Sequence, residues 1–139
     1  MPDGHYLASI DGEIMPKAEA MLPVTDEGLI RGDGVFEVMR IYDGVMFAAE
    51  EHYRRLERSA RNLRLPVDLE LVRTETARLL ATAAASGPLN DSVRIMCTRG
   101  GHRIVMTEPV HVYPDRLQLK AVEYAPTLLL DGIDRKSVV

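Results

Sequence analysis

The sequence predicts an α+β domain of two layers, in which a mainly antiparallel sheet carries two helices packed on one face. Three observations lead to this prediction. Short apolar runs meet at Asp-Gly turns, the strongest local signal for antiparallel hairpins. Two helical patterns follow one another in the middle of the chain, and further strand patterns come after them. With 139 residues, 46% of them hydrophobic, the chain is long enough to bury one core of ordinary size.

The composition argues against several classes of partner. The net charge of −4 is small and charges of both signs are interspersed, so neither nucleic acid nor an anionic membrane surface is expected as a partner. The single cysteine, Cys97, cannot form an internal disulfide, and we find neither a signal-peptide pattern nor an apolar run of transmembrane length. Together these features predict a cytoplasmic protein. Lysine is scarce, because only Lys17, Lys120 and Lys136 are lysines among the 17 basic residues.

The beginning of the chain predicts a hairpin and then a loop. Residues 6–10 and 13–15 are short runs on either side of an Asp-Gly turn, which predicts two antiparallel strands. Residues 24–34 are rich in turn formers, and Thr25 and Asp26 are able to cap a short helical turn there.

The clearest strand pattern covers residues 35–42 and continues through a second Asp-Gly turn into residues 45–47. Each face of the longer strand is mostly apolar and carries one charge, Glu37 on one face and Arg40 on the other. A strand covered on one side only would place polar residues at nearly every second position. We therefore expect both faces of this strand to be at least partly covered.

The periodicity then becomes helical and predicts a helix over residues 50–63, which ends before Pro66. Four residues form its apolar stripe: Tyr53, Leu56, Ala60 and Leu63. At about 100° per residue, three arginines fall opposite the stripe: Arg54, Arg58 and Arg61. His52, Arg55 and Ser59 line its border. Arg55 is therefore the one arginine in the middle of the helix that is placed to reach inward.

A second helix is predicted over residues 68–86, where a Gly-Pro pair stops it. Five of its residues are expected to face inward: Val72, Thr76, Leu79, Leu80 and Ala83.

Residues 92–99 form the next predicted strand, and its two faces differ. One is a core face formed by Val93, Ile95 and Cys97. The other could line a site and consists of Ser92, Arg94, Met96 and Thr98. Shorter strands are expected at 104–107 and 118–124, in segments bounded by prolines.

No short motif in the chain specifies a chemistry by itself. There is no phosphate loop of the usual spacing, no Cys/His pattern for a metal, and no serine in a nucleophile elbow. A set of arginines remains, on a loop, on strands and on a helix border: Arg31, Arg40, Arg55, Arg94 and Arg99. Because guanidinium groups suit phosphate and carboxylate, the residues alone predict a small anionic ligand.

The stretch RGDGVFEVMRIYDGVMFAAEEHYRRLERSA resembles the small N-terminal domain of the class IV (fold type IV) pyridoxal-phosphate enzymes. That family includes branched-chain and D-amino-acid aminotransferases and aminodeoxychorismate lyase. The matching pattern is GDGVFE, a strand and hairpin, and then EH-x-x-RL followed by SA; TRGG and a proline-bounded strand extend it to Gly132. The resemblance implies the cofactor pyridoxal 5′-phosphate. It also implies a homodimer with the site at a domain and subunit boundary.

The resemblance further implies roles for individual residues. The arginine of EH-x-x-RL, here Arg55, is expected to bind the cofactor phosphate. Residues around GDGVFE and on the TRG strand are expected near the substrate carboxylate or side chain. In this chain these are Arg31, Phe36, Arg40, Arg94 and Arg99.

Simpler interpretations stand beside these roles. Arg40 and Arg94 could each instead form a salt bridge to a nearby carboxylate such as Glu37 or Asp91. Three further residues have a structural alternative, as a turn cap, a core side chain and an ordinary helix-edge histidine respectively: Arg31, Phe36 and His52.

By resemblance, the parent enzyme is a pyridoxal-phosphate-dependent aminotransferase of branched-chain or D-amino-acid type. Its small-molecule partners would be an amino acid and a 2-oxo acid. An enzyme of the aminodeoxychorismate lyase type is the alternative within the family. A non-catalytic domain that dimerises or binds small anions is the alternative from another class.

The chain departs from the family in its last part. The family needs a lysine that holds the cofactor covalently and a second, larger domain. We expect residues 1–125 to form the N-terminal domain, residues 126–133 to begin an interdomain linker, and residues 134–139 to be a non-native tail, with the C-terminal domain absent. The tail reads DRKSVV, which is the translation of a common short-read sequencing adapter, GATCGGAAGAGCGTCGTG, before a stop codon.

Lys136 is a candidate for the cofactor lysine by its position alone, and a frayed terminal lysine is the simpler interpretation. The chain by itself is therefore expected to be inactive and not to retain the cofactor.

Overall fold

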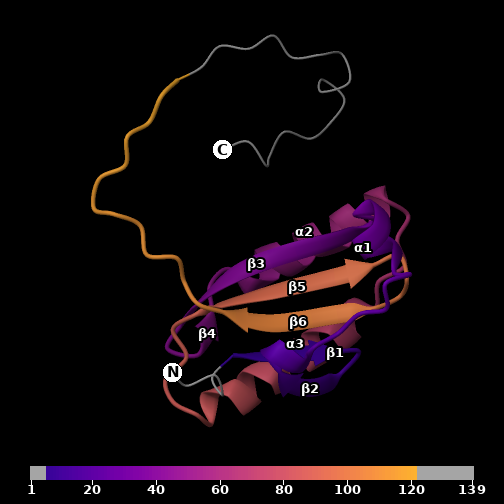
Figure 1. Cartoon of the computed structure of the whole chain (residues 1–139), viewed down its shortest axis with the longest axis horizontal. Coiled ribbons are helices and arrows are strands. Elements are labelled where there is room, and N and C mark those ends of the chain that lie inside the picture. Colours follow the sequence, from indigo (N-terminus) through magenta and orange to yellow (C-terminus); the bar gives the residue numbers. More distant parts are fainter. Residues whose placement is uncertain (1–5, 122–139) are drawn as a thin grey trace.

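The computed structural model of the chain describes residues 6–121 and shows a two-layer α+β domain (Figure 1). One layer is a six-stranded sheet in the order β2-β1-β6-β5-β3-β4, and its neighbouring strands are antiparallel. Its strands are β1 (Leu7–Ile10), β2 (Glu13–Pro16), β3 (Gly34–Tyr42), β4 (Val45–Met46), β5 (Ser92–Thr98) and β6 (Arg103–Glu108).

The other layer consists of the long helices α2 (Ala49–Asn62) and α3 (Leu69–Ala84), which lie behind the sheet in Figure 1. A 3-10 turn, η2 (Lys17–Glu19), and the short helix α1 (Glu27–Arg31) connect β2 to β3. The predicted fold class is confirmed. None of the helices in residues 6–121 combines the length and the apolarity that crossing a membrane requires.

Both predicted Asp-Gly hairpins are present. The backbone angle φ is 53° at Asp11 and 90° at Gly12 in the β1–β2 turn, and 47° at Asp43 and 80° at Gly44 in the β3–β4 turn. Two successive residues with positive φ give the turn whose twist matches that of paired strands, and an Asp-Gly pair adopts it with little strain. The two turns therefore set the ends of these strands.

Helix α2 buries the stripe that its periodicity predicts, with one exception. Tyr53, Leu56 and Ala60 are almost completely buried. Leu63, which the periodicity assigns to the same stripe, is 48% exposed. It is exposed because α2 ends at Asn62 and Leu63 is only its C-cap.

Helix α3 begins after its N-cap Asp68, whose side chain accepts a hydrogen bond from the main-chain N–H of Leu71 at 3.0 Å. All five residues predicted to face inward are buried: Val72, Thr76, Leu79, Leu80 and Ala83. Glu75 is buried as well, although an apolar pattern does not predict it.

Strand β5 has the predicted core face of Val93, Ile95 and Cys97. Burial raises the pKa of the Cys97 thiol to about 11, in keeping with a cysteine that packs as a small core side chain. The opposite face, which carries Arg94, is half-buried.

The two faces of β3 differ more than its sequence suggests. Four residues are buried on the face toward the helices: Val35, Glu37, Met39 and Ile41. On the other face, Phe36 is 62% and Tyr42 54% exposed. The expectation that both faces are at least partly covered is confirmed for the middle of the open face, where Val38 and Arg40 are half-buried, and is wrong for its ends. The physical reason is that α2 and α3 pack on the same side of the sheet (Figure 1).

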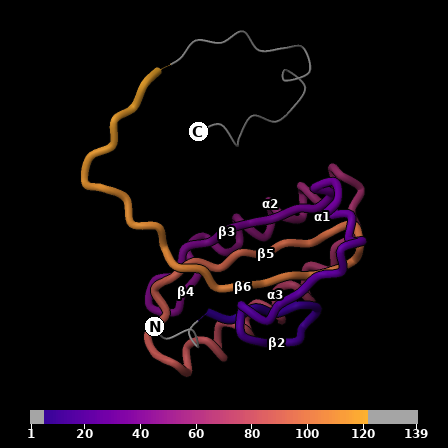
Figure 2. The backbone as a smooth tube through the Cα atoms, viewed as in Figure 1, coloured from indigo at the N-terminus to yellow at the C-terminus, as the bar shows by residue number. Residues whose placement is uncertain are grey.

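After β6 the chain leaves the sheet, as the orange tube in Figure 2 shows. Residues 109–121 are exposed and form neither a strand nor a helix. The strand predicted at 118–124 is thus wrong for residues 118–121, because a strand pattern needs a neighbouring strand with which to pair. The rest of that segment, the predicted linker 126–133 and the predicted tail 134–139 with Lys136 lie outside the described residues.

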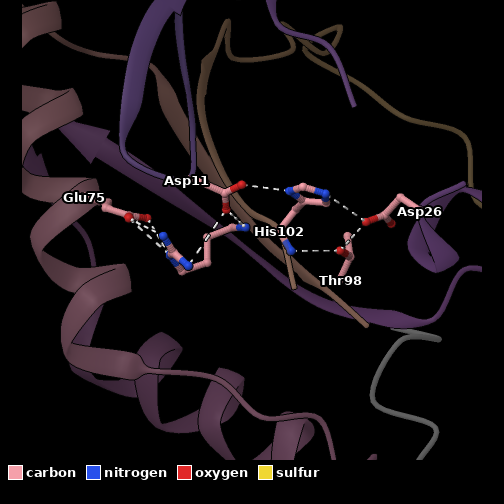
Figure 3. Close-up of polar contacts among 6 residues, drawn as sticks. Asp11, Asp26, Glu75, Thr98 and His102 are labelled. Carbon is pink, nitrogen blue, oxygen red and sulfur yellow. Dashed lines mark hydrogen bonds and ion pairs between the residues drawn. The ribbon is translucent and has the colours of Figure 1, made fainter. Parts of the chain in front are cut away.

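A chain of polar contacts joins the β1–β2 turn to the loop before α1 (Figure 3). The His102 ring lies between two carboxylates, with Nδ1 2.7 Å from Oδ2 of Asp11 and Nε2 3.9 Å from Oδ2 of Asp26. Asp26 accepts a hydrogen bond from Thr98 Oγ1 at 2.7 Å and, as the N-cap of α1, another from the Gly28 N–H at 2.7 Å. The cap of the predicted helical turn is therefore Asp26, and it also ties α1 to β5.

Candidate functional site

Arg55 lies in the second turn of α2 and reaches inward, as the helical periodicity predicts. Its Nε lies 2.6 Å from Oε1 of Glu37, and its Nη2 lies 2.5 Å from Oε2 of the same carboxylate. Glu37 comes from the buried face of β3 and its side chain is 3% exposed, whereas the Arg55 side chain is 51% exposed. One edge of the guanidinium is therefore held by the sheet, and the rest of the group faces solvent.

His52 contacts the same carboxylate from one turn earlier in α2. Its Nδ1 lies 2.8 Å from Oε2 of Glu37, and because a carboxylate only accepts, this nitrogen is the donor. The hydrogen bonds from Arg55 to Glu37 raise the pKa of the guanidinium further above its already high ordinary value. The positive charge of Arg55 is therefore permanent.

An open pocket of about 350 Å³ adjoins this cluster along α2. Its lining residues are Glu51, His52, Arg54, Arg55 and Arg58. Three arginines against one carboxylate make the pocket electropositive, and guanidinium groups present several donors to a tetrahedral anion. The donor set therefore fits a phosphate group.

Phe36, Arg40 and Arg94 occupy the open face of the sheet, opposite the long helices. Arg94 Cζ lies 5.9 Å from the centroid of the Phe36 ring, and its Nε lies 3.0 Å from Oε2 of Glu108 on β6. A salt bridge thus exists for Arg94, although with Glu108 and not with the two carboxylates that the sequence suggests. Arg40 donates from Nη1 to the main-chain carbonyls of Ile41, Asn90 and Asp91.

Arg31 and Arg99 lie near the Gly-Asp-Gly turn, which is formed by residues 32–34. Arg31 ends α1, where it is 62% exposed and lies 3.1 Å from Glu27. Arg99 donates from Nε to Oδ2 of Asp33 at 2.9 Å and from its other nitrogens to two main-chain carbonyls just after α2. Arg99 thereby joins the Gly-Asp-Gly turn to the C-terminal end of α2, where a cation is favourable.

The predicted site residues therefore fall in more than one place. Successive residues of a strand point to opposite faces, so Phe36 and Glu37 lie on different sides of the sheet. Arg55 belongs to the helical side, and the predicted substrate residues Phe36, Arg40 and Arg94 belong to the open side. Within residues 6–121, no cluster of His, Cys, Asp and Glu side chains could hold a metal ion.

Glu37 contacts both Arg55 and His52, although no short sequence motif predicts this role for it. A signal for it exists, because a carboxylate on an otherwise apolar strand face is buried only when a cation pairs with it. The arginine on the inner border of the following helix is the natural candidate for that cation. The two facts together would predict the Glu37–Arg55 pair.

The model of the family described as amino-transferase class IV matches residues 34–131. The matched segment includes Glu37, His52 and Arg55, and therefore the whole of the cluster around Arg55.

Two curated relatives share this region. A protein of Methanocaldococcus jannaschii assigned as a branched-chain-amino-acid aminotransferase is 37% identical over 92 residues, which are 66% of this chain and 31% of the relative. A D-alanine aminotransferase of Staphylococcus epidermidis is 35% identical over 97 residues, 66% of this chain and 32% of the relative.

Solved structures of an aminotransferase and of a lyase are also similar to this chain. A hypothetical aminotransferase from Mycobacterium tuberculosis in its PLP-bound form is 32% identical with a TM-score of 0.70, over 76% of this chain and 40% of that chain. The 4-amino-4-deoxychorismate lyase from Pseudomonas aeruginosa is 33% identical with a TM-score of 0.65, over 79% of this chain and 42% of that chain. The chain thus spans about a third of the length of the curated relatives and about two fifths of these structures.

Proposed function

Because the chain belongs to the class IV aminotransferase family, we propose that it is the N-terminal part of a pyridoxal-phosphate-dependent enzyme that transfers an amino group from an amino acid to a 2-oxo acid. The observation that carries the proposal is the Arg55 guanidinium, which Glu37 holds beside an arginine-lined pocket. The relatives point to a branched-chain or D-amino acid as the substrate. A homodimer and a cytoplasmic location belong to the same proposal.

The residues around Arg55 fit the phosphate of pyridoxal 5′-phosphate. Arg55 would donate to phosphate oxygens with the N–H groups that Glu37 does not use, and Arg54 and Arg58 would add positive charge. When bound, the cofactor supplies an electron sink for chemistry at the substrate α-carbon. The contribution of these side chains is to bind and orient the phosphate end.

We propose the open face of the sheet and the turns beside it as the substrate wall. Because Arg55 lies on the opposite side of β3, the proposal requires the substrate to meet the cofactor around the β3–β4 end of the sheet. Phe36 and Arg94 are the best placed for this role, because they contact each other on the face opposite both long helices. Arg40, Arg31 and Arg99 belong to the same proposal. Arg31 and Arg99 are paired with Glu27 and Asp33 in this structure, and Arg40 donates to main-chain carbonyls, so a substrate carboxylate would have to compete with these partners.

We expect the chain alone to lose pyridoxal 5′-phosphate on gel filtration but still to bind its phosphate end weakly and reversibly through Arg55. Calorimetric titration with excess cofactor measures this weak binding and so tests the role of Arg55. Arg55→Ala should weaken binding by about tenfold or more, since hydrogen bonds to charged groups contribute about 1.5–3 kcal/mol. Arg61→Ala is the matched control, because Arg61 lies on the same helix, pairs with Glu57 and does not line the pocket. Pyridoxal, which lacks the phosphate, should bind both variants equally. Unchanged affinity of Arg55→Ala for the phosphorylated cofactor would contradict the proposal.

By itself, the chain of 139 residues is proposed to lack turnover, since it spans about a third of the curated relatives. Addition of pyridoxal 5′-phosphate and then borohydride, followed by peptide mass spectrometry, should reveal no adduct at an active-site lysine. A stable adduct at Lys136 together with measurable transamination would overturn this expectation.

An enzyme of the aminodeoxychorismate lyase type is the second candidate, favoured by the similarity to the Pseudomonas aeruginosa lyase. Assays of the protein encoded by the complete gene separate the two. Release of pyruvate from aminodeoxychorismate without a 2-oxo acid acceptor indicates the lyase, and dependence on an acceptor indicates the aminotransferase. Equal binding of inorganic phosphate and pyridoxal 5′-phosphate, with neither activity, would instead favour a non-catalytic anion-binding domain.

A further inference from the structure

The buried carboxylate of Glu37 is the feature of the domain that the proposed function leaves unexplained. It is 3% exposed and stands on the core face of β3 between Val35 and Met39. An unpaired carboxylate at such a position would be strongly unfavourable, because burial removes the water that stabilises its charge. Its presence is understandable only through the two basic side chains that contact it, Arg55 and His52.

The geometry of the pair divides the guanidinium of Arg55 into two parts. A guanidinium has five N–H groups in a rigid planar fork, and the bonds to Glu37 use one on Nε and one on Nη2. Both N–H groups of Nη1 and the second of Nη2 therefore remain on the outer edge of the fork. The Arg55 side chain is 51% exposed and lines the pocket along α2, so these unused N–H groups are available to a ligand there.

We propose that Glu37 is a positioning residue for the anion site: it fixes the plane of the Arg55 guanidinium so that the outer edge of the fork faces a phosphate in two-point contact. This proposal rests on the proposed function, because the phosphate is the one that Arg55 is assigned to bind. Glu37 itself does not touch the ligand. It acts through Arg55, and His52 contacts the same carboxylate oxygen, Oε2, as Nη2 of Arg55.

The physical basis is pre-organisation. A free arginine side chain on a helix surface samples many rotamers, and binding must then immobilise it at an entropic cost. An arginine already held by two hydrogen bonds to a rigid strand loses little freedom when a phosphate arrives. Loss of Glu37 should therefore weaken phosphate binding about 3- to 10-fold, the range expected for one long side chain that is no longer held.

Whether phosphate affinity falls or rises when the Glu37 charge is removed distinguishes a positioning role from a purely electrostatic one. Glu37 is negative and lies beside an anion site, so removing its charge should strengthen anion binding if Coulomb interactions alone decide the affinity. Positioning predicts the opposite sign for Glu37→Gln. Glu51→Gln is the matched charge probe, because Glu51 lines the same pocket, is 67% exposed and pairs with Arg54 at 3.4 Å.

The experiment is a calorimetric titration of inorganic phosphate and of pyridoxal 5′-phosphate into the whole chain and its variants. Glu37→Gln should bind both ligands more weakly than the wild-type chain, while Glu51→Gln should bind them equally or more tightly. Equal or tighter binding by Glu37→Gln would overturn the positioning role. A wild-type chain that binds neither ligand would overturn the proposed function of Arg55 itself.

Two further measurements guard against a folding defect. The 15N–1H signal of the Arg55 Nε should be visible in the ligand-free wild-type chain and lost in Glu37→Gln, whereas the main-chain signals of β5 and β6 remain. Arg55→Lys keeps the charge but cannot form the fork, so the double variant with Glu37→Gln should bind no more weakly than Arg55→Lys alone. Additive losses would show that Glu37 acts on the fold in general and would contradict the proposal.

Discussion

Asp26, Glu37 and Glu75 are the carboxylates that residues 6–121 bury most deeply, and each is bonded to a side chain from another part of the fold. Because a buried charge has lost its water, its partner must supply the hydrogen bonds that water would have made. These pairs tie the α1 cap to β5, β3 to α2, and α3 to β6. At the residue scale, therefore, two hydrogen-bonded ion pairs join the long helices to the sheet in addition to the apolar contacts.

Glu75→Ala tests this at the contact between α3 and β6. The Arg103 guanidinium lies 2.8 to 3.1 Å from the two oxygens of Glu75. The Arg103 side chain is 24% exposed, so the substitution would leave a largely buried cation without its main partner. We expect the free energy of unfolding to fall by about 2–3 kcal/mol, as measured by urea denaturation.

Glu70→Ala is the control on the same helix, since its side chain is 88% exposed. It should change the free energy of unfolding by no more than about 0.5 kcal/mol. Losses of similar size in the two variants would mean that burial of the pair contributes nothing particular.

At the scale of elements, Asp11 connects the β1–β2 turn to the start of β6. Its Oδ1 accepts a hydrogen bond from the Arg103 main-chain N–H at 2.8 Å, and its Oδ2 lies 2.7 Å from Nδ1 of His102. Partial burial of the Asp11 carboxyl raises its pKa, but the bonds from Arg103 and His102 together outweigh this and hold the pKa below its usual value.

A lowered pKa makes this contact depend on pH with a definite sign. The unfolded chain binds a proton to Asp11 near pH 4, whereas the folded chain does so only at lower pH. The stabilisation is therefore complete above about pH 4 and is lost as the pH falls through the folded pKa. Because the side chain is 38% exposed, we expect less than about 1 kcal/mol.

Asp11→Asn removes the titrating group but keeps a residue that tolerates the positive φ of this turn. Urea denaturation at pH 6 and at pH 3 should show that the wild-type chain loses more stability on acidification than Asp11→Asn does. Glu13→Gln, an exposed position in the next strand, should behave as the wild-type chain. Identical pH dependence in the wild type and Asp11→Asn would contradict this account of the turn.

The elements that the sequence predicts well are those that local chemistry decides. Asp-Gly pairs give both hairpins, and one helical repeat places Tyr53 and Leu56 inward and Arg55 at the border. The missed features depend on parts of the chain that are distant in sequence. Thr98 meets Asp26 across 72 positions and Arg103 meets Glu75 across 28, and no local period contains such pairs.

Two wrong predictions have a common physical cause. An apolar pattern shows that a surface would gain from being covered, but it does not say what covers it. For this reason both faces of β3 look like core faces in the sequence, although Phe36 and Tyr42 are exposed. Residues 118–121 likewise look like a strand but have no neighbour in the described part of the chain with which to pair.

At the scale of the whole molecule, one face of the sheet is covered by the long helices and the other is open. The helices cover the first, and large apolar side chains remain exposed on or beside the second: Phe36, Tyr42, Val45 and Phe47. Contiguous exposed apolar groups are unusual on a domain that acts alone. This agrees with a chain that spans about a third of the curated relatives it matches.

A pair of substitutions in β3 distinguishes the two faces. Met39 is completely buried on the helical face, so Met39→Ala should lower the free energy of unfolding by about 2–5 kcal/mol through lost contacts and a new cavity. Phe36 is 62% exposed on the open face, so Phe36→Ser should change it by no more than about 0.5 kcal/mol. Urea denaturation at two protein concentrations measures both. Removing an apolar side chain that water already contacts changes the free energy of unfolding little. If Phe36→Ser were as destabilising as Met39→Ala, and more so at high protein concentration, a second copy of the chain would therefore have to cover the open face in solution.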